Sequence, residues 1–518
     1  MQVQTTQENA APARTKFRIF TMLIALYLSL FVAALDQTVL HSASGYTWIG
    51  GAYLLAKAAS MPIWAKFSDI WGRKPIILAG LVLFFASSII CALARTMTVL
   101  IVGRAIQGVG GGGLLQLVTI TISDVFSLRR RSLFLGITEI VWAVAAGVGP
   151  VLGGVLAEKV SWRWIFWLNL PITASAFALT LFFLDIHNPR TAVREGLVAV
   201  DWLGTLTILG LTLMILLGLN FGGVEAPWSS AKVICLIVFG ALMSVFFVYS
   251  ETKLAVRPIM LMQLFHDTSN VAAFVSSFAH GFVSIALEYY LPLFFQGANL
   301  MNPTKSGLMI LPLIITEALA AFLTGIVIHH TGDYKHVLSV GLVVMTIGTA
   351  LFTLFRAQTS IGMIAGLGVL VGAGVGLGFQ PPIIAIQARA SQNNVATATA
   401  TVGFLNNMAY SLSIVIGGVV FQNGIAMREE KLIDAGITRD LARLLAGPDA
   451  AANIDKIRDI TDAGQRLVVK EAFAWGLRNL WIMYACVAGC GALASLFIKR
   501  TVLSMDHTET KTGLRKDE

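Results

Sequence analysis

Fourteen long apolar runs follow one another along the chain, and they restrict its fold more than any other feature. Their approximate bounds are 19–40, 46–66, 75–94, 97–121, 132–157, 164–184, 202–222, 230–250, 270–296, 306–328, 337–355, 361–387, 396–423 and 478–498. A helix needs roughly 20 apolar residues to cross a bilayer, and each run is long enough. Each must be helical, because a lipid-exposed strand edge would leave backbone groups without hydrogen bonds. The runs predict an all-α polytopic membrane protein with 14 spans.

The composition agrees with this class. Apolar residues make up 56% of the 518 residues and charged residues only 13%, whereas charged residues make up about 25% of an ordinary soluble domain. These fractions exclude a disordered chain, a disulfide-rich miniprotein and most soluble enzymes. No phosphate-binding loop, metal-ligand cluster or nucleophile triad stands out in the sequence, so we predict no enzyme activity, cofactor or metal.

The net charge of +9 indicates a membrane topology rather than nucleic-acid binding. Lys and Arg stand mostly in short loops on the side of the N-terminus, which is typical of cytosolic loops. An even number of spans returns the C-terminus to the same side, so both termini are predicted to be cytosolic. We expect a monomer in a lipid bilayer that binds no nucleic acid.

An internal repeat divides the chain. The segment Ala65–Lys74 follows the second run, and a weaker copy, Gly325–Lys335, follows the tenth. Parallel halves of this kind are known in transporters. The repeat predicts two parallel six-helix bundles with two helices inserted between them. The expected divisions are a cytosolic tail at 1–18, an N-terminal bundle at 19–184, inserted helices and linkers at 185–267, a C-terminal bundle at 268–499 with an outer loop at 424–477, and a cytosolic tail at 500–518.

Several motifs resemble those of one transporter family. Three resemble signatures of the major facilitator superfamily: Ser68-Asp69-Ile-Trp-Gly72-Arg73-Lys74, Arg104-Ala-Ile-Gln107-Gly108 and Gly147-Val-Gly149-Pro150-Val-Leu-Gly153-Gly154. Four more resemble the fourteen-helix drug:proton antiporters of fungi: Leu35-Asp36-Gln37-Thr38-Val39, Trp162-Arg163-Trp164-Ile-Phe166, Asn169-Leu-Pro171 and Asp201-Trp202-Leu203-Gly204. The resemblance extends from about residue 20 to 500.

The resemblance implies a proton-coupling group made of Asp36, Arg104 and Gln107. Arg104 lies within an apolar run, where an arginine costs roughly 2.5–3.5 kcal/mol on insertion scales. It should therefore face a partner. An arginine does not release its proton, but it changes the proton affinity of a neighbouring carboxylate. A purely structural pair between helices is the alternative.

Two further groups follow from the resemblance. The charged residues Asp69, Arg73 and Lys74, with a tight turn at Gly72, form a conformational latch between the halves in the family. The antiporter motif, with Gly147, Gly149, Pro150, Gly153 and Gly154, bends the fifth helix and closes one half of the cavity against leak. Topological charge placement and simple helix packing are the respective alternatives.

Other polar and aromatic residues within the runs are candidates for the substrate cavity: Lys57, Glu139, Trp142, Glu288, Glu317 and Phe379. An ionisable residue inside a span is by default a functional hypothesis. Lys57 and Glu139 are expected either to pair with each other or to contact substrate, and Glu288 and Glu317 to contact a cation. Structural pairing is the alternative for each.

The first hairpin departs from the family pattern. About ten residues that follow the Asp-Gln-Thr-Val motif in the family are missing after Val39. Asp36 is therefore expected four residues from the end of the first helix, with reduced burial. A gene model that lost part of an exon and an adapted transporter are both open explanations.

These features together predict a proton-coupled secondary transporter that exports drug-like or toxin-like organic molecules by alternating access. A vacuolar carrier of basic amino acids or other small solutes is an alternative, and a sensor that binds without transport is another. The plasma membrane is the expected location, with the vacuolar membrane as the alternative.

Overall fold

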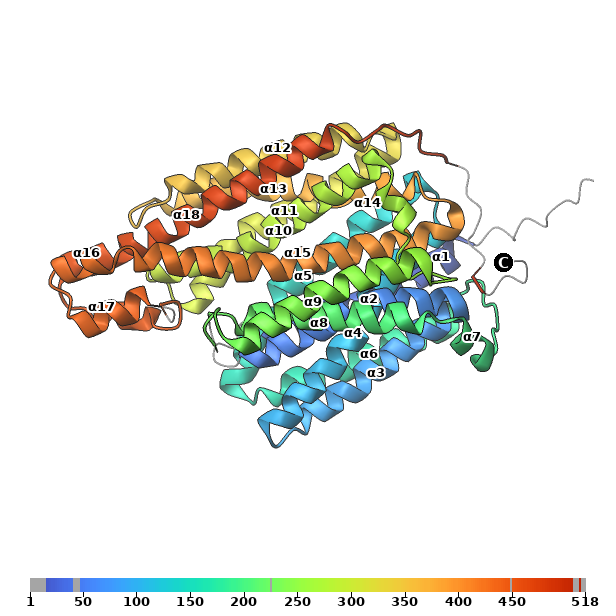
Figure 1. Ribbon diagram of the computed structural model, residues 1–518, viewed down its shortest axis with the longest axis horizontal. Coiled ribbons are helices and arrows are strands. Elements are labelled where there is room, and N and C mark those ends of the chain that lie inside the picture. The colour runs from blue at the N-terminus through green and yellow to red at the C-terminus, as the bar shows by residue number, and fades with distance from the viewer. Residues whose placement is uncertain (1–14, 41–46, 224–225, 448–449, 506–511, 514–518) are drawn as a thin grey trace, which may run out of the picture.

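The computed structural model describes residues 15–40, 47–223, 226–447, 450–505 and 512–513 (Figure 1). Most of these residues are helical, and the β-structure among them is one isolated bridge between Gly222 and Ala226. The α-helices are α1 (Lys16–Leu40), α2 (Thr47–Trp71), α3 (Arg73–Ala92), α4 (Met97–Val125), α5 (Leu128–Lys159), α6 (Arg163–Phe183), α7 (Val193–Ala199), α8 (Trp202–Phe221), α9 (Ala231–Lys253), α10 (Thr268–Gly297), α11 (Pro303–Thr331), α12 (Lys335–Leu351), α13 (Ile361–Phe379), α14 (Pro381–Gln387), α15 (Val395–Ala426), α16 (Glu429–Asp434), α17 (Arg439–Ala446) and α18 (Ala463–Ser495). Short 3-10 turns occur at η1 (Met262–Phe265), η2 (Phe352–Leu354), η3 (Gln392–Asn394) and η4 (Ile454–Ile457).

Each of the fourteen apolar runs coincides with a long helix, and the predicted all-α membrane fold is confirmed. Within the described ranges, 13 helices are long and apolar enough to cross a membrane. The remaining predicted span is α2, a 25-residue helix. Its apolar character is lower because it carries Lys57, Lys66 and Asp69.

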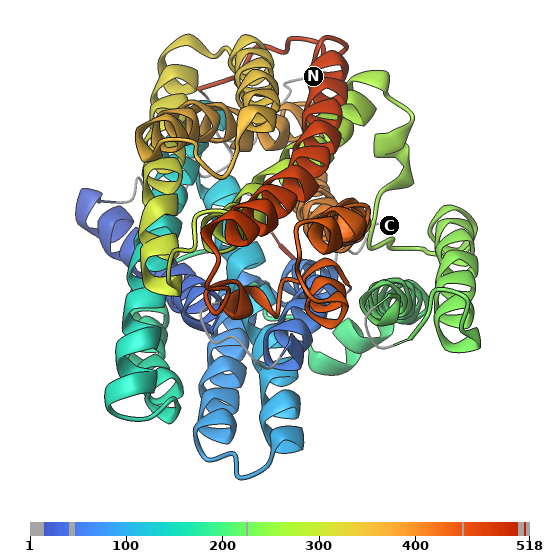
Figure 2. The ribbon, with the colours of Figure 1, turned by 90° about the vertical axis from the view of Figure 1, so that its left-hand side faces the viewer.

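The long helices pack into two groups. Helices α1–α6 pack on one another, with extensive contacts between α2 and α4, and we call them the N-terminal bundle. Helices α10–α15 and α18 form a second group, which we call the C-terminal bundle. The hairpin of α8 and α9 packs on α2 and α15 and lies at the side of the molecule, as the green helices on the right of Figure 2 show.

Glycines allow the closest helix approach in the N-terminal bundle. A Cβ on Gly108 of α4 would lie 2.9 Å from the Cα of Tyr53 on α2, and one on Gly112 would lie 2.8 Å from the backbone oxygen of Lys57. Small residues at such positions let helix backbones touch in lipid. The glycine run of α4 therefore serves packing, and it fixes the distance between α2 and α4.

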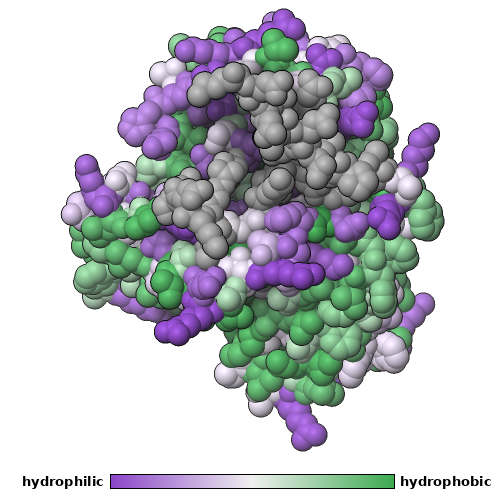
Figure 3. Space-filling view, turned by 90° about the vertical axis from the view of Figure 1, so that its right-hand side faces the viewer, coloured by the Kyte–Doolittle hydropathy of each residue, from purple (hydrophilic) through white to green (hydrophobic). Residues whose placement is uncertain are grey.

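The molecule has two distinct ends. The terminal side is the end at which α1 begins and α18 ends, on the right in Figure 1, and the far side is the opposite end, with α16 and α17. Figure 3 looks onto the terminal side and shows hydrophilic residues gathered there, with hydrophobic residues on the lower and left flanks. This distribution suits a membrane protein whose flanks face lipid and whose ends face water.

The two bundles meet mainly on the terminal side. There α5 contacts α11 closely: the Ser132 hydroxyl donates to the Gly325 carbonyl over 3.1 Å. Towards the far side the approach is looser: a Cβ on Gly147 would lie 3.8 Å from Leu311, whereas one on Gly325 would lie 2.5 Å from the Ser132 backbone oxygen. An apolar groove of about 370 Å³ lies between α5 and α11 in this region. The bundles are thus closed at the terminal side and diverge toward the far side.

Candidate functional site

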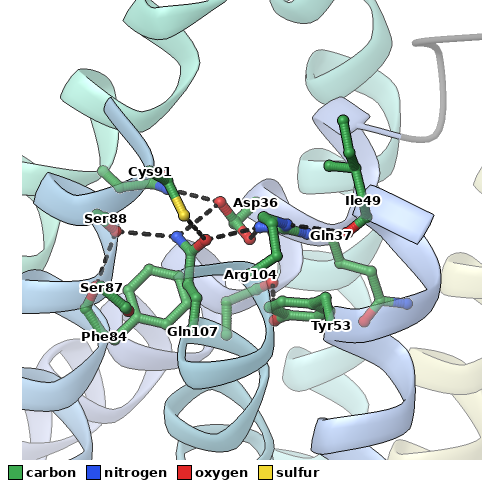
Figure 4. A network of polar contacts seen from close by, with 12 residues as sticks. Asp36, Gln37, Ile49, Tyr53, Phe84, Ser87, Ser88, Cys91, Arg104 and Gln107 are labelled. Carbon is green, nitrogen blue, oxygen red and sulfur yellow. Dashed lines mark hydrogen bonds and ion pairs between the residues drawn. The ribbon is translucent and has the colours of Figure 1, made fainter. Parts of the chain in front are cut away.

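The central feature of the N-terminal bundle is a buried ion pair (Figure 4). The Nη1 of Arg104 on α4 lies 2.5 Å from the Oδ2 of Asp36 on α1, and the two side chains are 1% and 0% exposed. Arg104 therefore has Asp36 as the ionic partner that was expected for an arginine in an apolar run. The guanidinium also lies 4.4 Å from the centre of the Tyr53 ring, a favourable cation–π distance.

The structure corrects the expectation for Asp36. The residue stands four positions before the end of α1, as predicted, but the predicted loss of burial is wrong because its exposed fraction is 0%. Helices α4, α5 and α6 all pack on α1, and they enclose the carboxylate near the helix end. Residues 41–46, where the shortened connection falls, lie outside the described residues.

Gln107 joins the ion pair, so the three predicted coupling residues lie together. Its Nε2 donates to Asp36 Oδ1 over 3.0 Å and to the Ser88 hydroxyl over 2.9 Å. Its Oε1 accepts from Arg104 over 2.7 Å. Both ends of this amide are therefore engaged inside the bundle.

The sequence did not identify one member of this network. Asn169 of α6 is 1% exposed, and its Nδ2 donates to Asp36 Oδ1 over 2.7 Å. The Asn-Leu-Pro motif resembles the family, but the resemblance gave it no role. The signal available in the sequence was a lone polar amide in an apolar run, which needs a hydrogen-bond partner in a membrane. We call Asp36, Arg104, Gln107 and Asn169 the buried polar network.

A second charged cluster lies at the terminal side, around the predicted latch. Arg73 contacts Asp69 over 2.6 Å and Asp124 of α4 over 2.7 Å. Gly72 has φ +93°, and a Cβ there would lie 2.8 Å from Pro189, so the turn favours glycine. Lys74 is half-buried and forms no ion pair with the described residues. The sequence predicted the Asp69–Arg73 contact but not Asp124, which lies on another helix.

The antiporter motif lies on α5, which runs without interruption from Leu128 to Lys159. Gly147 lies at the apolar groove between α5 and α11, and Gly149 and Gly153 are buried. The side chain of Pro150 and the surroundings of Gly154 lie outside the described residues. The predicted bend therefore stays a prediction.

Three half-buried carboxyl groups lie near the middle of the spans. Glu139 on α5, Glu288 on α10 and Glu317 on α11 are close enough to interact electrostatically with one another. All three also interact electrostatically with Tyr410 of α15. None of the three belongs to an ion pair that the described residues make. They bring acidic groups from both bundles into one region.

The predicted Lys57–Glu139 pair does not form in the described part of the chain. Lys57 is 5% exposed, and its Nζ instead donates to Gln37 Oε1 over 2.8 Å. The ammonium also lies 5.6 Å from the centre of the Trp142 ring. Lys57 is satisfied within the N-terminal bundle, which explains why it does not reach Glu139.

Phe379, the last of the predicted cavity residues, is half-buried on α13. Its ring packs edge-on against His280 of α10, with 5.9 Å between ring centres. His280 in turn contacts the Val375 carbonyl over 2.8 Å. This aromatic contact holds α10 and α13 together within the C-terminal bundle.

Two bundles of membrane-spanning helices, one of which encloses a buried ion pair, are typical of polytopic membrane transporters. The chain matches the family model described as Major Facilitator Superfamily over residues 19–418. The chain belongs to this superfamily, and it is a multi-pass membrane transporter rather than an enzyme.

Fungal relatives match nearly the whole chain. "Efflux pump dotC" of Dothistroma septosporum is 41% identical over 96% of this chain and 87% of its own length. "MFS-type transporter ppz2" of Metarhizium majus is 38% identical over 99% and 90%. "Efflux pump FUS6" of Gibberella fujikuroi is 33% identical over 98% and 93%.

A solved structure supports the fold independently. The crystal structure of the human organic anion transporter MFSD10 (TETRAN) aligns with a TM-score of 0.57, over 90% of this chain and 99% of that chain. The two sequences are 15% identical, so the likeness concerns the fold alone.

Proposed function

We propose that this protein is a proton-coupled transporter that exports drug-like or toxin-like organic molecules. The observation that carries the proposal is the Asp36–Arg104 ion pair, which is enclosed by spans and has almost no exposed surface. The relatives named efflux pumps support the direction of transport and the class of substrate.

The ion pair can couple a proton to a change of structure. Asp36 can accept a proton, whereas Arg104 keeps its charge at all accessible pH values. Protonation of Asp36 removes the charge that Arg104 faces, and a buried cation without its partner is strongly unfavourable. The network must then rearrange. A proton moving down a membrane potential supplies about 2.3 kcal/mol per 100 mV, and a pH difference adds to this.

Alternating access would use the two bundles as rocking units. In this scheme the terminal side is cytosolic, both termini lie in the cytosol, and the closed terminal side corresponds to a state open to the exterior. The Asp69–Arg73–Asp124 cluster, with Gly72 and Lys74, acts as the latch, and Gly147, Gly149, Pro150, Gly153 and Gly154 limit leak along α5. The transporter works as a monomer in the plasma membrane.

Transport in yeast tests this proposal. The protein, with a localisation tag, is expressed in a strain that lacks its own drug pumps, and the strain is screened for resistance to a panel of organic compounds. For a compound to which the protein gives resistance, transport is then measured in membrane vesicles with an imposed pH gradient. We expect its transport to require the gradient, to stop with a protonophore and to fall at least tenfold in Asp36→Asn. Gradient-independent transport, or binding without transport as in a sensor, would contradict the proposal.

A carrier of small cations, such as basic amino acids entering the vacuole, is the second candidate. The three carboxyl groups of Glu139, Glu288 and Glu317 favour it, because the described residues provide them with no ion-pair partner. Uptake of labelled lysine or arginine into vacuolar vesicles distinguishes the two functions. ATP-driven uptake that depends on this protein would favour the carrier, and its absence would favour the exporter.

A further inference from the structure

Asn169 is the member of the buried polar network to which no role has been assigned. We propose that Asn169 is a positioning residue whose side-chain amide turns over when Asp36 takes up a proton. In this way α6 responds to the protonation state of a carboxyl group on α1. The inference rests on the proposed proton coupling. It identifies Asn169 as the residue that accepts the hydrogen bond from protonated Asp36.

The charged form of Asp36 is surrounded by donors. Its two oxygens accept hydrogen bonds from Arg104 (2.5 Å), Gln107 (3.0 Å) and Asn169 (2.7 Å). The residue is 0% exposed, so the carboxylate lies away from bulk solvent. A protonated carboxyl group carries an O–H that must donate to an acceptor, and a buried donor without one is unfavourable. Among the described residues, one of these three neighbours must therefore present an acceptor when Asp36 is protonated.

Two of the neighbours are poor candidates. Arg104 has donors only, and a guanidinium keeps its proton. Gln107 would have to break several contacts to turn: its Oε1 accepts from Arg104 and from the Cys91 thiol, and its Nε2 also donates to Ser88. Its present orientation is held at both ends.

Asn169 meets the requirement. Its Nδ2 donates to Asp36, and no described residue donates to its amide oxygen. A half-turn of the terminal torsion exchanges the nitrogen and the oxygen with little change of shape. The oxygen would then accept from the protonated Asp36, at the cost of no other hydrogen bond that the described residues make.

Among the described residues, three other titratable groups interact with Asp36. These groups are the Arg104 guanidinium of α4, the Tyr53 hydroxyl of α2 and the Cys91 thiol of α3. Helix α5 reaches this part of α1 through the Ala145 carbonyl, which accepts from the Thr38 hydroxyl over 2.9 Å. Helix α6 contributes the uncharged amide. Among the described residues, Asn169 is thus the uncharged neighbour of Asp36 whose amide can exchange donor for acceptor without breaking hydrogen bonds to a third residue.

Infrared difference spectroscopy of the purified protein between alkaline and acidic pH tests the proposal. Protonation of Asp36 produces a carboxylic C=O band that is absent in Asp36→Asn. We expect this band at a low frequency in the wild type, because the acid is hydrogen-bonded, and at a higher frequency in Asn169→Leu. Asn169→Ser should restore the low frequency, since a hydroxyl can donate or accept. Thr173→Val is the matched control, because the Thr173 hydroxyl bonds only the Asn169 backbone carbonyl.

The outcomes separate this inference from the proposed function. If no band depends on Asp36, both the proton coupling and the role of Asn169 are wrong. If the band is present but Asn169→Leu leaves its frequency unchanged, only the role of Asn169 is wrong. A transport profile adds a second measurement: Asn169→Leu should move half-maximal transport to higher pH by up to about one unit, because the charged form loses one donor and the neutral form loses a weaker acceptor bond. An unmoved profile would also overturn the inference.

Discussion

Asp36 and Arg104 depend on each other because neither side chain reaches water. Replacing Asp36 by Asn keeps the shape but leaves Arg104 as a buried cation without its ionic partner. We expect the folded state to lose about 3–5 kcal/mol, the range found when one member of a buried pair is removed. Thermal denaturation in detergent measures the effect. The matched control is Asp185→Asn, which breaks the exposed Arg18–Asp185 pair and should change little. Equal melting temperatures for the two variants would contradict the prediction.

A second residue prediction concerns Asp267, which precedes α10 outside the spans. The Ser269 backbone amide and the Arg389 guanidinium hold its pKa below the usual range. A lowered pKa in the folded state adds stability above the unfolded pKa, and this stability is lost as pH falls through the folded pKa. Asp267→Ala should therefore melt at a lower temperature than the wild type at pH 7, by an amount that corresponds to roughly 0.5–2 kcal/mol.

The pH dependence makes this prediction specific. The difference in melting temperature between the wild type and Asp267→Ala should shrink as the pH falls below the range in which aspartates titrate. Asp267→Asn can still cap the helix and should lie between the two at pH 7. A difference that stays constant between pH 7 and acid would show that the charge of Asp267 is irrelevant.

Single residues also show what the sequence could and could not predict about the site. The cost of a charge in an apolar run predicted a partner for Arg104, and the family motifs pointed to Asp36. Asn169 and Asp124 were missed because each meets its partner only through the fold: Asn169 and Asp36 are 133 positions apart, and Asp124 and Arg73 are 51 apart. No local pattern records such contacts.

At the scale of elements, apolar length predicted the spans but not the full helices. The last predicted span began at residue 478, whereas α18 begins at Ala463. The polar first part of α18 lies beyond the apolar run, and it packs on α16, where Leu432 is fully buried. The sequence pattern reports where lipid surrounds a helix. Packing against other protein segments sets where the helix ends.

The α2–α4 contact provides the element-scale prediction. Gly108 lies against the backbone of Tyr53, which cannot move aside as a flexible side chain would. Gly108→Ala should therefore force the helices apart and cost about 1–3 kcal/mol, as overpacking does. Folded yield and melting temperature in detergent measure this. Gly366→Ala on α13 is the control, because nothing lies within 4 Å of its added Cβ. It should be neutral or slightly stabilising, since alanine favours a helix. Similar losses in both variants would contradict the prediction.

At the scale of the whole molecule, the internal repeat pointed to two related halves, and the family match agrees with that arrangement. The conformational state could not be predicted, because it depends on contacts between distant segments. Such contacts include the bond from Arg131 of α5 to Gln387 of α14 and the bond from Asn407 of α15 to Met61 of α2. The hydrogen bonds from Arg131 to Gln387, from Gln387 to Ser123 and from Ser132 to Gly325 join the two bundles toward the terminal side.

Gln387 contacts both bundles at the closed terminal side, and replacing its side chain gives the last prediction. Its Oε1 accepts from Arg131 over 2.9 Å, and its Nε2 donates to Ser123 and Thr399. Arg131 and Gln387 are 1% and 2% exposed, so Gln387→Ala leaves a buried cation short of an acceptor. A hydrogen bond to a charged group contributes about 1.5–3 kcal/mol. Its loss should shift the equilibrium between closed and open terminal sides about ten- to a hundredfold.

Thiol labelling follows this shift. Met61 is 5% exposed at the contact between the bundles, so Met61→Cys, in a background without the native cysteines, should react slowly while the terminal side is closed. Adding Gln387→Ala should raise the labelling rate at least tenfold, because the cysteine becomes accessible whenever the bundles separate. Asn423→Ala is the matched control: it also removes an amide from the C-terminal bundle, but that amide bonds only the Val419 carbonyl of its own helix, near the far side. If both variants label at the rate of the Met61→Cys parent, the Arg131–Gln387 contact does not hold the terminal side closed, and other contacts between the bundles, such as the Ser132–Gly325 hydrogen bond, must do so.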